Sequence, residues 1–180
     1  MRIQPAELGD APAIAGVVVE SWRAAYRGLV ADEFLDELSV DDRTGRWASR
    51  IAAPHASVLV ADDDGSVVGA CSSAAPSPDR DARPGCAELG ALYVHPDHWR
   101  RGVGRALLSA ALAGLDAAGW REVTLWVLAG NEAAISFYRR FGFRADGAEG
   151  VHPRSGAATA RFCRSLTGPS SADRDRKGDP

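Results

Sequence analysis

The sequence predicts a mixed α/β fold, because helical patterns come first, strand patterns follow, and a strand–helix–strand–helix block comes after them. Two short apolar runs, at residues 89–94 and 123–128, suit central strands that are buried on both faces. Between them, residues 103–118 carry leucines on several sides and predict a heavily buried helix that ends at Gly119. These observations place the two runs in the middle of one sheet.

The N-terminal third is predicted to be mostly helical. Residues 2–5 suit a short strand. Asp10 then precedes a proline and a periodic apolar run, which predicts an N-capped helix that ends near Gly28. Two further helices are expected over residues 32–38 and 40–51.

The remaining strands come in two pairs. Residues 56–61 and 66–75 are separated by the bend D-D-D-G, a strong hairpin signal. Residues 144–148 and 157–166 are expected to form the last pair, around a turn that contains proline and glycine.

Length and composition favour a single cytoplasmic domain. We expect residues 1–166 to form that domain and residues 167–180, which lack an apolar anchor, to be a disordered tail. No window approaches the ~18 apolar residues of a membrane span, and the N-terminus lacks the apolar core of a signal peptide. A net charge of -3 with mixed signs argues against nucleic acid as a partner. Three dispersed cysteines indicate neither a disulfide framework nor a zinc site.

A glycine-rich turn, R-R-G-V-G-R at residues 100–105, lies between a buried strand and the start of a helix. Unpaired N–H groups at a helix N-terminus carry about half a positive charge and suit a phosphate. The glycines allow close approach, and three arginines add donors. A tight turn without a ligand is the alternative. A P-loop is excluded because G-K-[ST] is absent, and a dinucleotide fingerprint is excluded because Leu107 occupies the third glycine position.

With these motifs, the chain resembles the GNAT superfamily of acetyl-CoA-dependent N-acetyltransferases. The family pattern is [QR]-x-x-G-x-[GA] after a strand ending in V-x-P, followed by N-x-x-A-x-x-F-Y-x-x-x-G-F. Here V-H-P stands at 94–96, the turn at 100–105, and the second motif is matched by Asn131, Ala134, Phe137, Tyr138, Gly142 and Phe143. Trp99 departs from the pattern, since the family often has Gln or Arg there. The resemblance covers roughly residues 1–166 and implies a mostly antiparallel sheet with a β-α-β-α core that binds acetyl-CoA.

The resemblance also implies which residues hold the cofactor. Main-chain groups of Leu92, Tyr93 and Val94 would pair with the pantetheine arm as a strand does. The pyrophosphate would be held by the amides of Arg100, Arg101, Gly102, Val103, Gly104 and Arg105. Asn131 would contact the pantetheine arm, and it also suits the N-cap of a helix over residues 131–140.

Tyr138 matches the family tyrosine that lies near the acetyl sulfur. Alternatively it belongs to the core, because it shares a helical apolar stripe with Ala134, Phe137 and Phe141. Proton transfer from a phenol with a pKa of ~10 to the thiolate of a thiol with a pKa of ~8.5 is unfavourable by about 2 kcal/mol. A hydrogen bond to the developing thiolate is therefore sufficient for this role.

An amine acceptor must lose a proton, which for a lysine-like amine costs about 4–5 kcal/mol at pH 7. Glu88, at the start of the strand before the turn, is the preferred general base. The alternatives are that a water chain removes the proton, or that Glu88 is a surface carboxylate at the end of a strand. The strand over residues 123–128 carries no carboxylate. His95 and His98 lack a third ligand in spacing, so no metal is expected.

The leading hypothesis is acetyl transfer from acetyl-CoA to a primary amine by direct attack in a ternary complex. A non-catalytic CoA-binding regulatory module and an enzyme for a longer acyl-CoA are the alternatives. The acceptor, a small-molecule or peptide amine, is not identified by the sequence, although Glu20 and Arg23 are positioned to select a charged one. Trp22, Tyr26 and Trp47 are expected mainly in the core. A homodimer is the default assembly.

Overall fold

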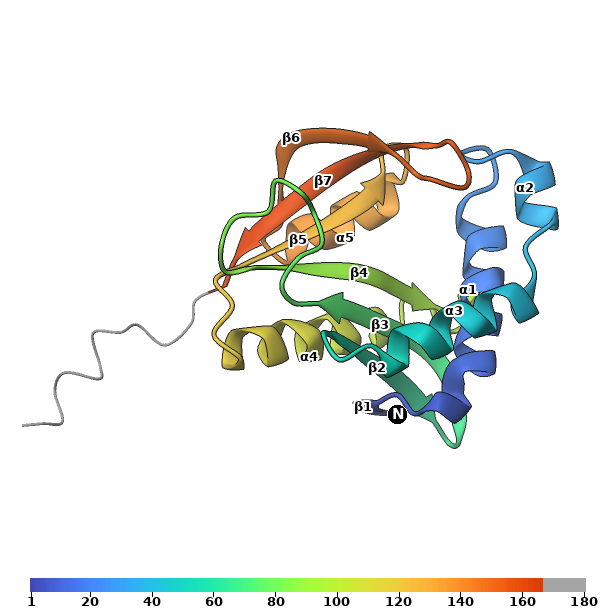
Figure 1. The fold of residues 1–180 in the computed structure, drawn as a ribbon. Coiled ribbons are helices and arrows are strands. Elements are labelled where there is room, and N and C mark those ends of the chain that lie inside the picture. The colour runs from blue at the N-terminus through green and yellow to red at the C-terminus, as the bar shows by residue number, and fades with distance from the viewer. Residues whose placement is uncertain (167–180) are drawn as a thin grey trace, which may run out of the picture.

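A seven-stranded sheet of strand order β1-β2-β3-β4-β5-β7-β6 runs through the computed structural model, which describes residues 1–166 (Figure 1). β4 and β5 pair in parallel and the other neighbours are antiparallel, so the predicted mixed α/β fold is confirmed. The predicted tail lies outside the described residues. The strands are β1 (Arg2–Pro5), β2 (Ala56–Asp63), β3 (Ser66–Ala74), β4 (Cys86–Val94), β5 (Glu122–Leu128), β6 (Arg144–Val151) and β7 (Ala158–Ser165).

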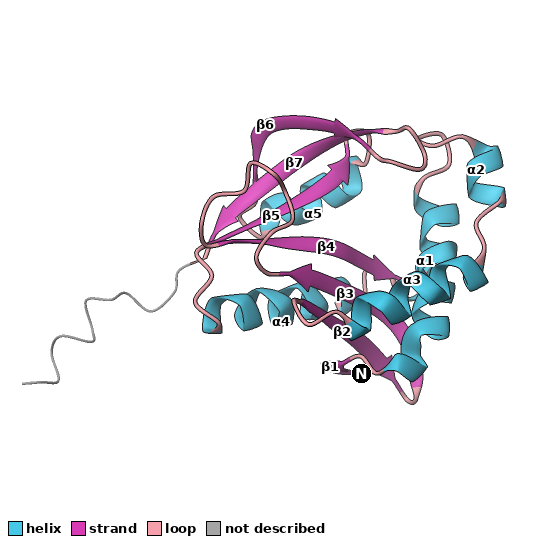
Figure 2. Cartoon of the chain, in the orientation of Figure 1, coloured by secondary structure: helices cyan, strands magenta, loops and turns pink. Residues whose placement is uncertain are grey.

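Helices cover both faces of the sheet (Figure 2). One face carries α1 (Ala11–Ala25), α2 (Asp32–Asp36) and α3 (Val40–Ala52), with a core that includes the buried indoles of Trp22 and Trp47. The other face carries α4 (Val103–Ala117) and α5 (Glu132–Arg140), whose apolar residues pack with β4, β5 and β7. No helix within residues 1–166 is long and apolar enough to cross a membrane.

Local capping explains where α3 begins, whereas α1 begins after Asp10, as predicted, without a side-chain cap. The Ser39 hydroxyl accepts a hydrogen bond from the Asp42 amide at 3.3 Å, and the acidic first turn complements the helix dipole. Asp10, predicted as the N-cap of α1, makes no side-chain cap bond to that helix. Its carboxylate instead accepts from the Glu7 amide at 2.8 Å and closes the short 3-10 turn Leu8–Asp10.

The feature that positions the site is the separation of β4 from β5. The two strands pair over three positions, from Cys86 with Glu122 to Glu88 with Thr124. One residue further along β4, the register with β3 shifts, so that Gly90 is the extra residue of a bulge. Because a bulge bends its strand, the distal half of β4 diverges from β5 and leaves an edge without a strand partner.

Candidate active site

A cleft of about 1260 Å³ opens where β4 and β5 separate. Its walls come from residues 89–94 of β4 and 126–128 of β5, from the N-terminus of α4, and from α5. Most of the lining therefore comes from the strand–helix–strand–helix block. A stretch of α1 that includes Trp22, Tyr26 at the C-cap of that helix, His152, and Thr159 of β7 complete it.

The predicted phosphate turn forms one end of this cleft. Arg100 and Gly102 both adopt left-handed backbone, with φ of 60° and 87°, and Gly102 is the N-cap of α4. A left-handed non-glycine residue such as Arg100 costs about 1–2 kcal/mol, a strain that is common at ligand sites. The Ala106 amide donates to the Gly102 carbonyl at 2.9 Å, so the three amides before it, of Val103, Gly104 and Arg105, have no acceptor among the described residues. Such a set of amides suits a phosphate.

Trp99 ties this turn to the end of β4. Its indole Nε1 donates to the Val94 carbonyl at 2.7 Å, while the side chain stays 40% exposed. The departure from the family pattern at this position therefore supplies a turn anchor. It also means that the Val94 carbonyl, predicted to pair with a pantetheine arm, already accepts one hydrogen bond.

Strand alternation decides which main-chain groups face the cleft. The His95 amide donates to the Val68 carbonyl of β3. Because orientation alternates along a strand, Tyr93 also directs its main chain to β3, and Leu92 and Val94 direct theirs to the unpaired edge. Tyr93 instead contributes its side chain, which lines the cleft.

All three tyrosines of the chain, Tyr26, Tyr93 and Tyr138, line this cleft. Burial raises the pKa of Tyr138 well above its usual range, with Cys71 and Tyr93 adding to the effect. Burial also raises the pKa of Tyr26. Both phenols are therefore hydrogen-bond donors at neutral pH. The Tyr138 ring packs on Phe143 with centroids 5.8 Å apart, so it is a core residue and a cleft residue at once.

Asn131 caps α5, as one of its two interpretations predicted. Its Oδ1 accepts from the Ala134 amide at 3.1 Å. The same side chain lines the cleft beside Tyr26, whose pKa it lowers in part. A capping residue at this position thus keeps its amide group available at the cleft wall.

Glu88 lies just outside the cleft lining. It precedes the bulge, and its Oε1 is 3.6 Å from the point where a Cβ on Gly90 would stand. Burial raises the pKa of Glu88, Asp79 adds to the increase, and Arg50 opposes it. Gly90 itself lines the cleft, so the carboxylate faces the site across a residue that has no side chain.

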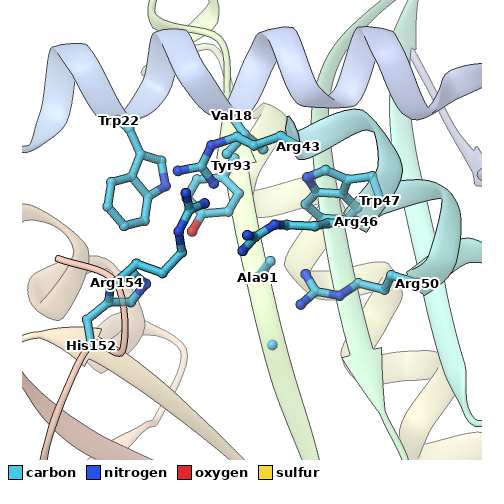
Figure 3. Close-up of a pocket in the computed structure, with 11 residues that line it drawn as sticks. Val18, Trp22, Arg43, Arg46, Trp47, Arg50, Ala91, Tyr93, His152 and Arg154 are labelled. Carbon is cyan, nitrogen blue, oxygen red and sulfur yellow. The ribbon is translucent and has the colours of Figure 1, made fainter. Parts of the chain in front are cut away.

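A second cavity, of about 190 Å³, opens on the α1 and α3 side of the bulge (Figure 3). It adjoins the cleft, because both are lined by Trp22, Gly90, Ala91, Tyr93 and His152. Five basic residues that the sequence analysis did not single out surround it: Arg43, Arg46, Arg50, His152 and Arg154. Glu20 and Arg23, the positions proposed to select a charged acceptor, line neither cavity and pair with each other at 3.5 Å.

His95 and His98 remain a polar turn. Their rings lie 6.1 Å apart, and His95 Nδ1 accepts from the Asp97 amide at 3.4 Å. Within residues 1–166 no group of three His, Cys, Asp or Glu side chains is arranged to hold a metal ion.

The sheet opens between its parallel strands β4 and β5, and the unpaired amides at the N-terminus of α4 lie at one end of this opening. This arrangement defines the acetyltransferase class of α/β fold. The Acetyltransferase (GNAT) family profile matches residues 18–143. The uncharacterized N-acetyltransferase YuaI of Bacillus subtilis is 32% identical over 142 residues, 78% of this chain and 79% of that protein. The uncharacterized N-acetyltransferase Rv2669 of Mycobacterium tuberculosis is 30% identical, over 77% and 85%.

Solved structures agree on the fold. The PaiA N-acetyltransferase of Thermoplasma acidophilum, in complex with coenzyme A, superimposes with a TM-score of 0.73 at 21% identity, over 89% of this chain and 98% of that one. The chain belongs to the GNAT acetyltransferase family. The prediction of an N-acetyltransferase of this family is thereby confirmed.

Proposed function

We propose that the protein transfers the acetyl group of acetyl-CoA to a primary amine by direct attack in a ternary complex. The observation that carries the proposal is the meeting of two cavities at the β4 bulge. The long cleft between β4 and β5 suits the donor, and the smaller cavity on the other side of Gly90 and Ala91 suits the acceptor. Donor and acceptor can thus be bound together, without a covalent enzyme intermediate.

In this proposal the donor extends along the cleft from the turn to the bulge. The pyrophosphate lies at the amides of the turn over residues 100–105, where the helix dipole favours negative charge. The pantetheine arm follows the free edge of β4 at Leu92 and Val94, with Asn131 opposite. This arrangement leads the thioester to Tyr138.

The chemistry requires one bond to form and one to break. The amine nitrogen attacks the thioester carbonyl carbon, the carbon–sulfur bond breaks, and CoA leaves as a thiolate. The proton that the amine nitrogen loses passes to Glu88, directly or through water, and the thiolate takes up a proton from solvent. Tyr138, which burial keeps protonated, donates a hydrogen bond to the sulfur as charge develops on it. Burial raises the pKa of the nearby Cys71 thiol to about 12, so that thiol is not a competing nucleophile.

Acetyl-CoA titration by calorimetry, followed by thiol release with a panel of amines, tests the proposal. Binding with turnover supports an enzyme. Binding with no thiol release from any amine would instead support the regulatory module. Donor competition with longer acyl-CoAs checks the acyl preference. A cytoplasmic location and a homodimer remain predictions.

Tyr138→Phe removes only the hydroxyl and should lower kcat about 100-fold, the usual effect of one lost donor to a developing anion. The KM for acetyl-CoA should change less than about threefold, because the ring still packs on Phe143. Steady-state thiol release measures both constants. An unchanged kcat would assign Tyr138 to the core alone.

Glu88→Gln tests the proposed base through the pH profile of kcat/KM. Glu88 accepts a proton only when ionised, and its pKa lies above the ordinary ~4.3. The kcat/KM of the wild type should therefore fall as the pH drops through that raised pKa. In Glu88→Gln this acid limb should disappear, and the rate should be about 10- to 100-fold lower than that of the wild type. Glu149→Gln, on exposed β6, is the control. Persistence of the limb in Glu88→Gln would exclude Glu88 as the base.

A further inference from the structure

The cavity behind the β4 bulge, which we term the arginine pocket, gathers positive charge from two distant segments. Arg43, Arg46 and Arg50 occupy positions i, i+3 and i+7 of α3, so they share one face of the helix. Arg154 reaches the same space from the segment between β6 and β7, and His152 lies beside it. Figure 3 shows their guanidinium groups directed from both sides towards the space over Ala91 and Tyr93.

These charges are poorly compensated by the protein. Within residues 1–166, none of Arg43, Arg46 and Arg50 lies within salt-bridge distance of a carboxylate, and Arg154 has one partner, the exposed Asp42, at 3.7 Å. Arg161, by contrast, is paired with three aspartates. Arg161 is thus neutralised by direct ion pairs, whereas Arg43, Arg46 and Arg50 have no directly paired carboxylate among the described residues.

Two buried donors in the pocket have no acceptor among the described residues. They are Nε of Arg43 and Nε1 of Trp22, and the indole is only 3% exposed. The Arg43 guanidinium lies 5.0 Å above the Trp22 ring. A buried donor without an acceptor costs about 1–3 kcal/mol, so this end of the protein carries donors in excess of its own acceptors.

The pKa values of two pocket residues, Arg43 and His152, are both lowered. Burial lowers the pKa of Arg43, and the charges of Arg154 and Arg46 lower it further. Burial lowers the pKa of His152 as well, with Arg43 and Arg154 contributing. The ring is therefore neutral at pH 7, and its Nδ1 accepts from the Ser155 amide at 3.2 Å, which leaves the proton on Nε2. His152 thus adds a donor and no base to the pocket.

We propose that the arginine pocket binds an oxyanion group, a carboxylate or a phosphate, carried by the acceptor amine. This inference rests on the proposed transferase function and names its substrate class: small amines that also bear negative charge. Guanidinium groups match both oxyanions through paired hydrogen bonds. A volume of about 190 Å³ admits a small acidic group, and the shared lining at Gly90 and Ala91 leaves the amine facing the donor cleft. Polyamines and lysine-rich peptides would be repelled.

The test compares matched amines with and without an acidic group. Glutamate and O-phosphoethanolamine should be acetylated with kcat/KM at least about tenfold above that of putrescine and ethanolamine. The double variant Arg46→Gln/Arg50→Gln should raise the KM of the acidic amines at least about tenfold and leave acetyl-CoA affinity within twofold. The control Arg2→Gln/Arg144→Gln removes the same net charge from two exposed residues outside both cavities.

A binding measurement separates this inference from the proposed function. Glutarate and inorganic phosphate, titrated by calorimetry in the presence of CoA, should bind to the wild type and to the control, and at least about tenfold more weakly to the double variant. If that pattern holds but no amine is acetylated, the proposed function fails and the anion site stands. Equal anion affinity in the double variant and the control, or preference for putrescine, would overturn the inference. So would a double variant that loses acetyl-CoA affinity with unchanged amine KM, because the arginines would then serve the donor.

Discussion

Gly104→Glu is expected to weaken acetyl-CoA binding at least about 100-fold while the protein stays folded. A Cβ at Gly104 would lie 3.6 Å from Val94 Cγ2 and 3.8 Å from Phe137 Cζ, which are ordinary van der Waals distances. The backbone thus tolerates a side chain here. The glutamate carboxylate, however, would occupy the free first-turn amides of α4 and repel a diphosphate.

The control for this variant is Gly104→Ala, which adds the Cβ without the charge. We expect its acetyl-CoA affinity to stay within about fivefold of the wild type. Calorimetric titration gives the affinities, and thermal unfolding shows whether each variant is folded; an acid in the first turn should if anything stabilise the helix. If Gly104→Glu binds acetyl-CoA as tightly as Gly104→Ala does, the diphosphate lies elsewhere.

Elements whose signals are local were predicted well. The helix predicted over residues 103–118 is α4, Val103–Ala117, because its glycine-rich start and Gly119, with φ of 85°, both terminate helical backbone. β5 is within one residue of its expected start. β4 begins at Cys86, three residues before the apolar run that predicted it. Its first residues are strand because they pair with β5, a tertiary contact that the run does not encode.

The bulge at Gly90 was missed for a related reason. Residues 89–94 read as an uninterrupted strand, and the shift appears only in the pairing with β3. Yet this bulge creates the divergence of β4 and β5 on which the cleft depends. The contiguous motif therefore predicted the donor residues without predicting the shape that contains them.

The acceptor side could not be assembled from one sequence. Arg43 and Arg154 are more than a hundred residues apart, and their meeting depends on how α3 and the segment between β6 and β7 fold over the same end of the sheet. The arginine spacing on α3 was a signal that could have been used. His152 and Arg154 lie in a turn whose proline and glycine indicate only a change of direction. Trp22 and Trp47, expected in the core, are core residues that also line this pocket.

Arg161→Met is expected to lower the free energy of unfolding by about 2 kcal/mol, between the scales for an exposed and a buried ion pair, because Asp79 and Asp146 are half-buried and Asp81 is exposed. The Arg161 side chain is 11% exposed and joins two segments to β7, the loop between β3 and β4 and strand β6. It donates to both Asp81 oxygens at 2.7 and 2.8 Å and to Asp79 at 3.3 Å in the loop, and to Asp146 at 2.8 Å in β6. Without the guanidinium, three carboxylates would face one another. Urea unfolding at pH 7 measures the loss. Arg164→Met, on the opposite face of the same strand, should change it by less than about 0.5 kcal/mol.

The pH dependence of this difference tests its electrostatic origin. Hydrogen bonds from Arg161 hold the pKa of Asp81 below its ordinary value. A carboxylate with a lowered folded-state pKa stabilises the fold above its unfolded pKa of ~3.9, and this contribution is lost as the pH falls towards the folded pKa. In Arg161→Met the contribution is absent at every pH, and protonation also relieves the repulsion among the aspartates. The gap between wild type and variant should therefore be widest near neutral pH and narrow below about pH 4. A gap that stays constant from pH 7 to pH 3 would mean that Arg161 stabilises the protein through its packing on Trp126, 5.5 Å from the ring centroid, and not through its charge.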